Sequence, residues 1–133
     1  MTAEDNWSES EIQKSQLEDP DMRRIVEKKL KLAYRLSRQE ITPESPATKR
    51  YWSLWNYVHV KDVVLYRKWE SDDGSSYRWQ LILPKSRIQE VLLEVHDSGS
   101  EGHFGVMNTL RRIRERLYWD RLRADVEKMV QRM

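Results

Sequence analysis

The chain contains no cysteine, so it has neither a disulfide framework nor thiol chemistry. An intracellular origin agrees with this composition, because disulfides form and persist mainly in oxidising compartments. Long apolar runs are also missing: no stretch approaches the roughly 18 residues that a membrane span requires, and Met1 is followed by Thr-Ala-Glu-Asp rather than by a basic and apolar leader. We therefore expect a soluble, non-secreted protein without membrane contact.

A strong excess of charge is missing as well. The 24 Lys and Arg residues exceed the 22 Asp and Glu residues by two, which is too little to imply nucleic-acid binding by itself. The distribution is more informative, since residues 1–27 hold eight acidic and three basic side chains, whereas residues 111–123 hold six arginines against two acids. The basic charge is therefore concentrated near the C-terminal end.

Apolar residues make up only 38% of the 133 residues and charged residues 35%, which indicates a small core and solvated helices. Six Trp and six Tyr residues can bury large areas, so we expect a core rich in aromatic side chains. The length allows one ordinary domain or two small ones.

The first part of the chain carries helix signals. Ser8 and Glu11 have the spacing of a capping box, which predicts a short helix that ends at Asp19-Pro20-Asp21. Apolar residues then recur at helical spacing and predict a second helix to about Arg38. The residues of this pattern are Met22, Ile25, Val26, Leu32, Ala33 and Leu36. After a break at residues 41–46, an aromatic stripe predicts a further short helix, with Tyr51, Trp52, Trp55 and Val58 on one side.

Residues 63–83 have the pattern of a β-hairpin. Residues 63–69 are β-branched and aromatic, residues 71–76 are turn formers, and residues 77–83 alternate before Pro84. Val58 and Val60 could add a third short strand. One strand face, which we expect to pack on the aromatic helix, carries Tyr77, Trp79, Leu81 and Leu83.

The C-terminal part predicts three short helices that begin near Lys85, Val106 and Leu122. Tyr118-Trp119-Asp120 forms the joint between the last two, where Asp120 can cap the third helix, and this pair could form a helix-turn-helix. We therefore expect an α+β fold, with helices and a small antiparallel sheet over residues 1–84 and a three-helix module over residues 85–133.

Between two of these helices, residues 95–105 contain His96, His103 and three of the four glycines. A segment this rich in Gly and Ser can bring imidazoles together, but the two histidines can equally be solvated polar residues. A nucleophilic triad would have to form within this one loop, where adjacent residues rarely converge. Asp72 and Asp73 fit a turn better than a metal-assisted catalytic site, so we expect no catalytic residue.

A series of motifs runs in order through the C-terminal part: Leu81-Ile82-Leu83-Pro84-Lys85, His96-Asp97-Ser98, Gly102-His103-Phe104-Gly105, Thr109-Leu110, Tyr118-Trp119 and Asp125-Val126. This series resembles the His-His-Cys-Cys zinc-binding domain of integrases from gypsy-type LTR retrotransposons. The resemblance covers about residues 81–133. Residues 11–20 and the hairpin are more loosely similar to the N-terminal extension that precedes this domain in the same polyproteins.

In such domains two histidines and two cysteines hold zinc tetrahedrally, and the resemblance assigns the first two ligands to His96 and His103. The cysteines are absent, and the chain stops at Met133, about where the first would follow. Two imidazoles alone hold zinc weakly, so we expect a bound zinc only with ligands from a second molecule or from Asp97 or Glu101. Otherwise the histidines cap helices or bond backbone carbonyls, and the loop after the first histidine or the terminal helix is loose or repacked.

The resemblance also implies that the domain binds the element's DNA ends and holds subunits together. Arginine bridges phosphates with its planar fork, and the candidates are Arg111, Arg112, Arg114, Arg116, Arg121 and Arg123. We therefore expect the non-catalytic N-terminal region of a retrotransposon integrase, or of a host protein derived from one, that acts in the nucleus. Its partners would be DNA and either further copies of itself or other integrase domains. The alternative is a protein-interaction or oligomerisation module in which the basic helix is only solvated.

Overall fold

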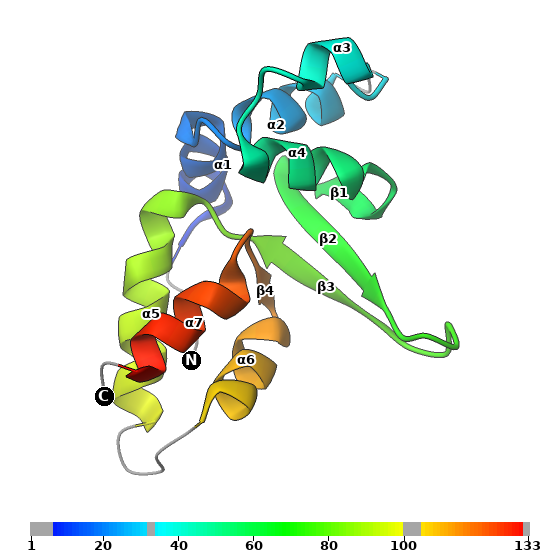
Figure 1. Ribbon diagram of the computed structural model, residues 1–133. Helices are drawn as coiled ribbons and strands as arrows, with labels where there is room; N and C mark the ends of the chain where they lie inside the picture. Colours follow the sequence, from blue (N-terminus) through cyan, green and yellow to red (C-terminus); the bar gives the residue numbers. More distant parts are fainter. Residues whose placement is uncertain (1–6, 32–33, 100–104, 132–133) are drawn as a thin grey trace.

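The computed structural model describes residues 7–31, 34–99 and 105–131. Of the features predicted above, Leu32, Ala33, residues 100–104 and Met133 lie outside these ranges. Figure 1 shows helices at both ends of a small sheet, with the hairpin projecting to one side. The predicted α+β fold class is confirmed.

The helices and strands follow one another in this order: α1 (Glu9–Glu18), α2 (Arg23–Leu30), α3 (Arg38–Ile41), α4 (Pro46–Ser53), the 3-10 helix η2 (Trp55–Tyr57), β1 (Val58–Lys61), β2 (Val64–Glu70), β3 (Tyr77–Ile82), α5 (Lys85–Gly99), α6 (Val106–Arg114), β4 (Leu117–Tyr118) and α7 (Leu122–Gln131). Within the described ranges no helix is both long and apolar enough to cross a membrane.

Helix α1 begins and ends where the sequence signals predict. Ser8 Oγ accepts a hydrogen bond from the Glu11 N–H at 3.1 Å, which caps the helix. Asp19 follows its last turn, where one carboxylate oxygen accepts from the Asp21 N–H at 2.9 Å and the other accepts from the Lys85 N–H at 2.7 Å. The turn after α1 therefore also caps the start of α5 and connects the N-terminal helices to the C-terminal ones.

The helix predicted to reach Arg38 ends at Leu30, so this prediction is wrong. A capping box, Ser37–Glu40, starts the separate helix α3. Just before it, the buried Leu36 is not helical, and its C=O accepts a hydrogen bond from Trp52 Nε1 at 2.6 Å. The capping signal and this long-range bond override the apolar periodicity of the segment.

Helix α4 begins earlier than the aromatic stripe predicts. Ser45 Oγ accepts from the Thr48 N–H at 3.1 Å, and Pro46 occupies the start of the helix. Trp55 lies in η2 and Val58 opens β1, so the prediction of one helix through all four stripe residues is wrong.

Four strands form one sheet in the order β1-β2-β3-β4. The first three are antiparallel, which confirms the predicted hairpin and its third strand. β4 was predicted as a joint between helices, but it pairs parallel to β3, so the sheet is mixed rather than antiparallel. The Leu81 and Leu83 N–H groups donate to the C=O groups of Arg116 and Tyr118, each at 2.8 Å.

Apolar clusters lie on both faces of the sheet. Leu81 and Leu83 lie in the cluster with α5, α6 and α7, whereas Ile82 lies in the cluster with α2 and Tyr51 of α4. Successive strand residues point to opposite faces. The predicted packing of Leu81 and Leu83 on the aromatic helix is therefore wrong, and Ile82 makes this contact instead.

A buried amide joins α1 to the sheet. Gln16 is fully buried, and its Nε2 donates to the C=O groups of Leu65 and Ile82 at 3.1 and 2.9 Å. Its Oε1 accepts from the Leu65 N–H at 2.9 Å. Because the β2–β3 ladder ends at the pair Tyr66 and Leu81, the side chain takes the place of the next main-chain partner.

Candidate nucleic-acid interface and histidine site

His96 lies in the last turns of α5, because this helix continues to Gly99. The predicted end of the helix at the first histidine is therefore corrected. The half-buried imidazole lines a groove of about 610 Å³ between α5 and α7. His103, Glu101 and the side chain of Asp97 lie outside the described structure. The pairing of the two histidines stays a prediction.

The described residues around His96 do not fit a zinc ion. Helix α7 contributes Asp125, Lys128 and Met129 to the groove. Asp125 already accepts a hydrogen bond from Trp119 Nε1 at 2.8 Å, and the Lys128 ammonium repels a cation. Zinc takes four ligands from cysteine, histidine and carboxylates, and no group of three such residues meets within the described part of the chain.

The six predicted arginines follow one another through α6, the β4 connection and the start of α7. Five are exposed and Arg112 is half-buried. Arg123 Nε donates to Glu127 at 3.0 Å, in an exposed pair of the kind that contributes little to stability. The two acids of this segment differ, since Glu115 is exposed whereas both Asp120 oxygens accept from the Arg50 guanidinium. Asp120 does not precede α7 directly, because Arg121 lies between them.

Three of these arginines meet two arginines of the hairpin in one cleft of about 460 Å³, which we call the arginine cleft. It lies between β2–β3 and the β4–α7 segment and is lined by Arg67, Trp69, Arg78, Gln80, Arg114, Tyr118, Trp119, Arg121, Leu122 and Arg123. None of these lining residues is acidic. The remaining predicted arginines do not line it; they are Arg111, Arg112 and Arg116.

Two arginines of the cleft are held against aromatic rings. Arg67 Cζ lies 4.4 Å from the Tyr118 ring centroid, and Arg78 Cζ lies 4.3 Å from the Trp69 ring centroid. Such a contact restricts the side chain while the guanidinium can still donate hydrogen bonds through its N–H groups. Burial raises the pKa of the Tyr118 phenol, so this ring adds no negative charge to the cleft at neutral pH.

Two buried polar atoms of the cleft lack a hydrogen-bond partner within the described protein: Arg67 Nε and Gln80 Oε1. The two residues are neighbours across the β2–β3 pair. Gln80 is oriented by its other amide atom, since Nε2 donates to the Arg114 C=O at 2.7 Å. Buried polar groups are normally hydrogen-bonded, so these atoms mark a place where a ligand can supply both an acceptor and a donor.

Arg67 and Arg78 of the hairpin were not predicted as site residues. The sequence nevertheless contained a signal for a shared strand face. Arg67 and Trp69 are two residues apart on one strand, and Arg78 and Gln80 are two residues apart on the other. Residues two apart share a strand face, and the register pairs the two sets across the hairpin. The contribution of β4 had no such local signal.

Comparison with known protein families identifies the C-terminal part of the chain. Residues 83–132 match the model described as the integrase zinc binding domain. No curated protein and no solved structure matches the chain. The match begins next to the end of β3 and includes α5, α6, β4 and α7. Residues 83–132 therefore match the integrase zinc-binding domain family, and this match supports an integrase N-terminal region.

Proposed function

We propose that the chain is the non-catalytic N-terminal region of a gypsy-type retrotransposon integrase, or of a host protein derived from one, and that it contributes DNA binding and subunit assembly. The observation that carries the DNA-binding part is the exposed arginine set of the matched domain. In this proposal the chain acts in the nucleus and its residues neither cut nor join DNA. Residues 1–84 serve as the N-terminal extension and residues 85–133 as the helical module.

The charge balance around these arginines supports a DNA contact. Proteins bind the DNA backbone mainly by bringing Lys and Arg side chains to its phosphates, which releases counterions. Arg50 pairs with Asp120, one of only two acids among residues 111–123. Residues 111–123 therefore carry a local excess of positive charge in the sequence, six arginines against two acids, which an external polyanion can offset.

Reversing the charge of one arginine of α6 and of one arginine that follows this helix tests the DNA-binding part of the proposal. Changing Arg111 and Arg116 to Glu removes two exposed positive charges that lie outside the arginine cleft. We expect the affinity for a fluorescent duplex to fall at least about tenfold at about 50 mM salt, and the slope of log affinity against log salt to become shallower. Fluorescence anisotropy over a salt series measures both quantities.

The matched control reverses two exposed lysines on distant helices, Lys14 of α1 and Lys49 of α4. It changes the net charge by the same amount, so a general loss of attraction would weaken both variants equally. A wild-type affinity in the Arg111→Glu, Arg116→Glu protein at low salt would refute the assignment of DNA binding to these two arginines.

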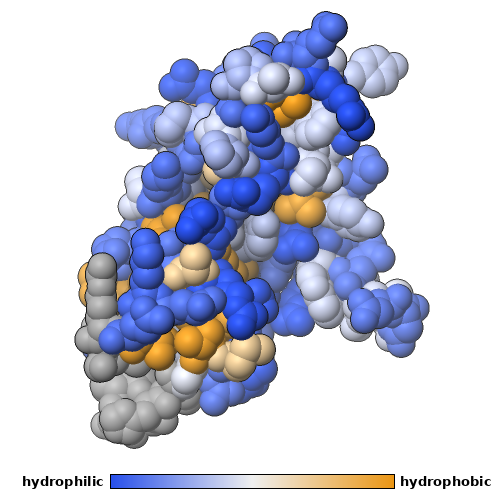
Figure 2. Space-filling model, viewed as in Figure 1, coloured by the Kyte–Doolittle hydropathy of each residue, from blue (hydrophilic) through white to orange (hydrophobic). Residues whose placement is uncertain are grey.

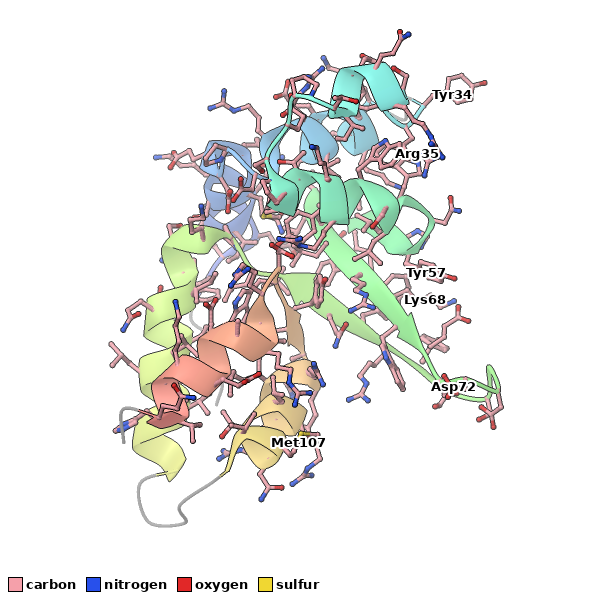
Figure 3. All side chains as sticks on the ribbon, viewed as in Figure 1. Tyr34, Arg35, Tyr57, Lys68, Asp72 and Met107 are labelled. Atoms are coloured by element: carbon pink, nitrogen blue, oxygen red, sulfur yellow. The ribbon has the colours of Figure 1, made fainter. Side chains whose placement is uncertain are left out.

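A second function, protein interaction without DNA binding, is favoured by exposed apolar side chains. Leu93 of α5 is 53% exposed and Met107 of α6 is 62% exposed. In the view of Figure 2 the hydrophobic surface gathers mainly where α5, α6 and α7 lie, and Figure 3 places Met107 on the outer side of α6. Exposed apolar patches of this kind often mark contact surfaces.

Sedimentation velocity and DNA binding together separate the two functions. If the chain is only an interaction module, its sedimentation coefficient rises with concentration, the change of Leu93 and Met107 to Lys abolishes that rise, and no duplex binds at low salt. If the chain binds DNA, the same two substitutions leave the affinity for a duplex at or above that of the wild type.

A further inference from the structure

We propose that the arginine cleft is a phosphate-binding subsite that holds one phosphodiester group of a nucleic-acid strand between the hairpin and the β4–α7 segment. This inference rests on the proposed function and deepens it, because it adds Arg67, Arg78 and Gln80 of the hairpin to the DNA-binding surface. The strand then contacts both the region before the matched domain and the domain itself.

The charge of the cleft favours an anion. Five guanidinium groups line one space of about 460 Å³ and none of the residues that line it is acidic. Like charges brought together repel one another and destabilise the compact state. A phosphodiester in the cleft offsets this repulsion, so binding and folding are coupled, and the anion raises the melting temperature.

The geometry of Arg67 suits a phosphate better than a diffuse counterion. Its guanidinium is held at 4.4 Å from the Tyr118 ring centroid, and its buried Nε has no partner within the described protein. A charged N–H donor that meets a phosphate oxygen forms a short, strong hydrogen bond. Because stacking already orders the side chain, binding loses little further conformational entropy.

Gln80 points to a strand rather than a free phosphate ion. Its Oε1 is an acceptor and cannot bond a phosphate oxygen, so its partner has to be an N–H or O–H group. The cleft volume corresponds to roughly fifteen water molecules, which leaves room for the sugars on either side of a phosphodiester. A water held between strand and protein, or the 2′-hydroxyl group of an RNA strand, then supplies the donor.

The test compares Arg67→Met with Lys68→Met. Both variants lose one positive charge from β2, but Lys68 lies on the opposite strand face, over the Tyr77 ring at 4.7 Å, and it projects from the hairpin in Figure 3. Affinities are measured by anisotropy for duplex DNA, single-stranded DNA and RNA of the same sequence, after circular dichroism has confirmed folding. We expect Arg67→Met to weaken binding about tenfold or more and Lys68→Met to change it less than about twofold.

A charge-conserving variant, Arg67→Lys, isolates the planar fork. It keeps the charge of the cleft but loses the stacked Nε donor, so we expect its affinity to fall while its salt dependence stays that of the wild type. If Arg67→Met does not fold, Arg121→Met replaces it, since Arg121 is an exposed residue of the same cleft.

The outcomes separate this inference from the proposed function. Wild-type affinity in Arg67→Met, together with loss of affinity in the Arg111→Glu, Arg116→Glu protein, would overturn the subsite and leave DNA binding intact. A melting-temperature rise with inorganic phosphate that equals the rise with an oligonucleotide would assign the cleft to free phosphate and also overturn the subsite. Absence of nucleic-acid binding by the wild type at low salt would overturn both.

Discussion

Replacing Gln16 by leucine is expected to destabilise the protein strongly, although no part of the candidate interface is touched. The side chain is fully buried, and its amide makes three hydrogen bonds to the main chain of β2 and β3, with Leu65 and Ile82. Leucine has a similar volume but no polar atom. The substitution therefore leaves one N–H group and two C=O groups without their partner.

The expected loss follows from these three groups. A buried main-chain group left unpaired costs about 1–3 kcal/mol, so three such groups cost about 3 kcal/mol even at the lower bound. The greater apolar burial of leucine returns about 1 kcal/mol. We expect the free energy of unfolding to fall by about 2–4 kcal/mol, which is a large part of the about 5–15 kcal/mol typical of a folded domain.

Urea unfolding followed by tryptophan fluorescence measures this change, with an unchanged slope as evidence that the native state stays compact. The matched control is Gln13→Leu, which makes the same substitution at a half-buried position of α1 and should shift the free energy by less than about 1 kcal/mol. Equal stability of the two variants would refute the reasoning, because it would show that the amide does not complete the sheet.

Four further predictions concern the turns, a histidine, the metal and the cleft. Val63→Gly is expected to raise the free energy of unfolding by about 1 kcal/mol in urea unfolding, because Val63 has a left-handed backbone with a φ of 62° that a β-branched residue adopts only with strain. Burial, together with Lys29 and Lys68, holds the pKa of His59 below its ordinary value. Folding therefore favours the neutral ring, and this contribution to stability is lost as the pH falls below about 6.5; an NMR titration midpoint at or above that value would contradict it. Zinc or a chelator is expected to leave the melting temperature of this 133-residue chain unchanged, and a sizeable zinc-dependent rise would show that the ligand set is complete. Arg121→Gly is expected to raise the free energy of unfolding by about 0.5–1 kcal/mol while it weakens DNA binding in anisotropy, and a stabler protein with full affinity would exclude Arg121 from the interface.

Local signals predicted the parts of the fold that depend on adjacent residues. Ser8 caps α1 through the Glu11 N–H, as the spacing indicates. The alternation and turn residues of the hairpin predicted β2 and β3, and helical periodicity predicted the three C-terminal helices. The integrase zinc-binding domain was predicted from the order of short motifs, and the family match over residues 83–132 confirms this part of the prediction.

Long-range contacts decided the features that local signals did not predict. The non-helical conformation of Leu36, beyond the end of α2, is stabilised by a hydrogen bond from Trp52 to its C=O, sixteen residues away. The side of the sheet on which Leu81 packs depends on which helices cover each face. β4 consists of two residues, too few to show any periodicity, and it exists because Leu81 donates to the C=O group just before it and Leu83 donates to the C=O group of its last residue.

The pairing of β4 with β3 also decides which arginines can act together. A run of arginines predicts a basic face on one helix, but α6 ends at Arg114 and the chain then enters the sheet. Parallel pairing with β3 brings Tyr118 against Arg67, and the turn into α7 carries Arg121 to the same cleft. Arg121 has a φ of 67°, a conformation that glycine adopts without strain. An arginine held there at some cost in stability, in a cleft of five guanidinium groups, supports an interface in which charge matters more than the stability of the turn.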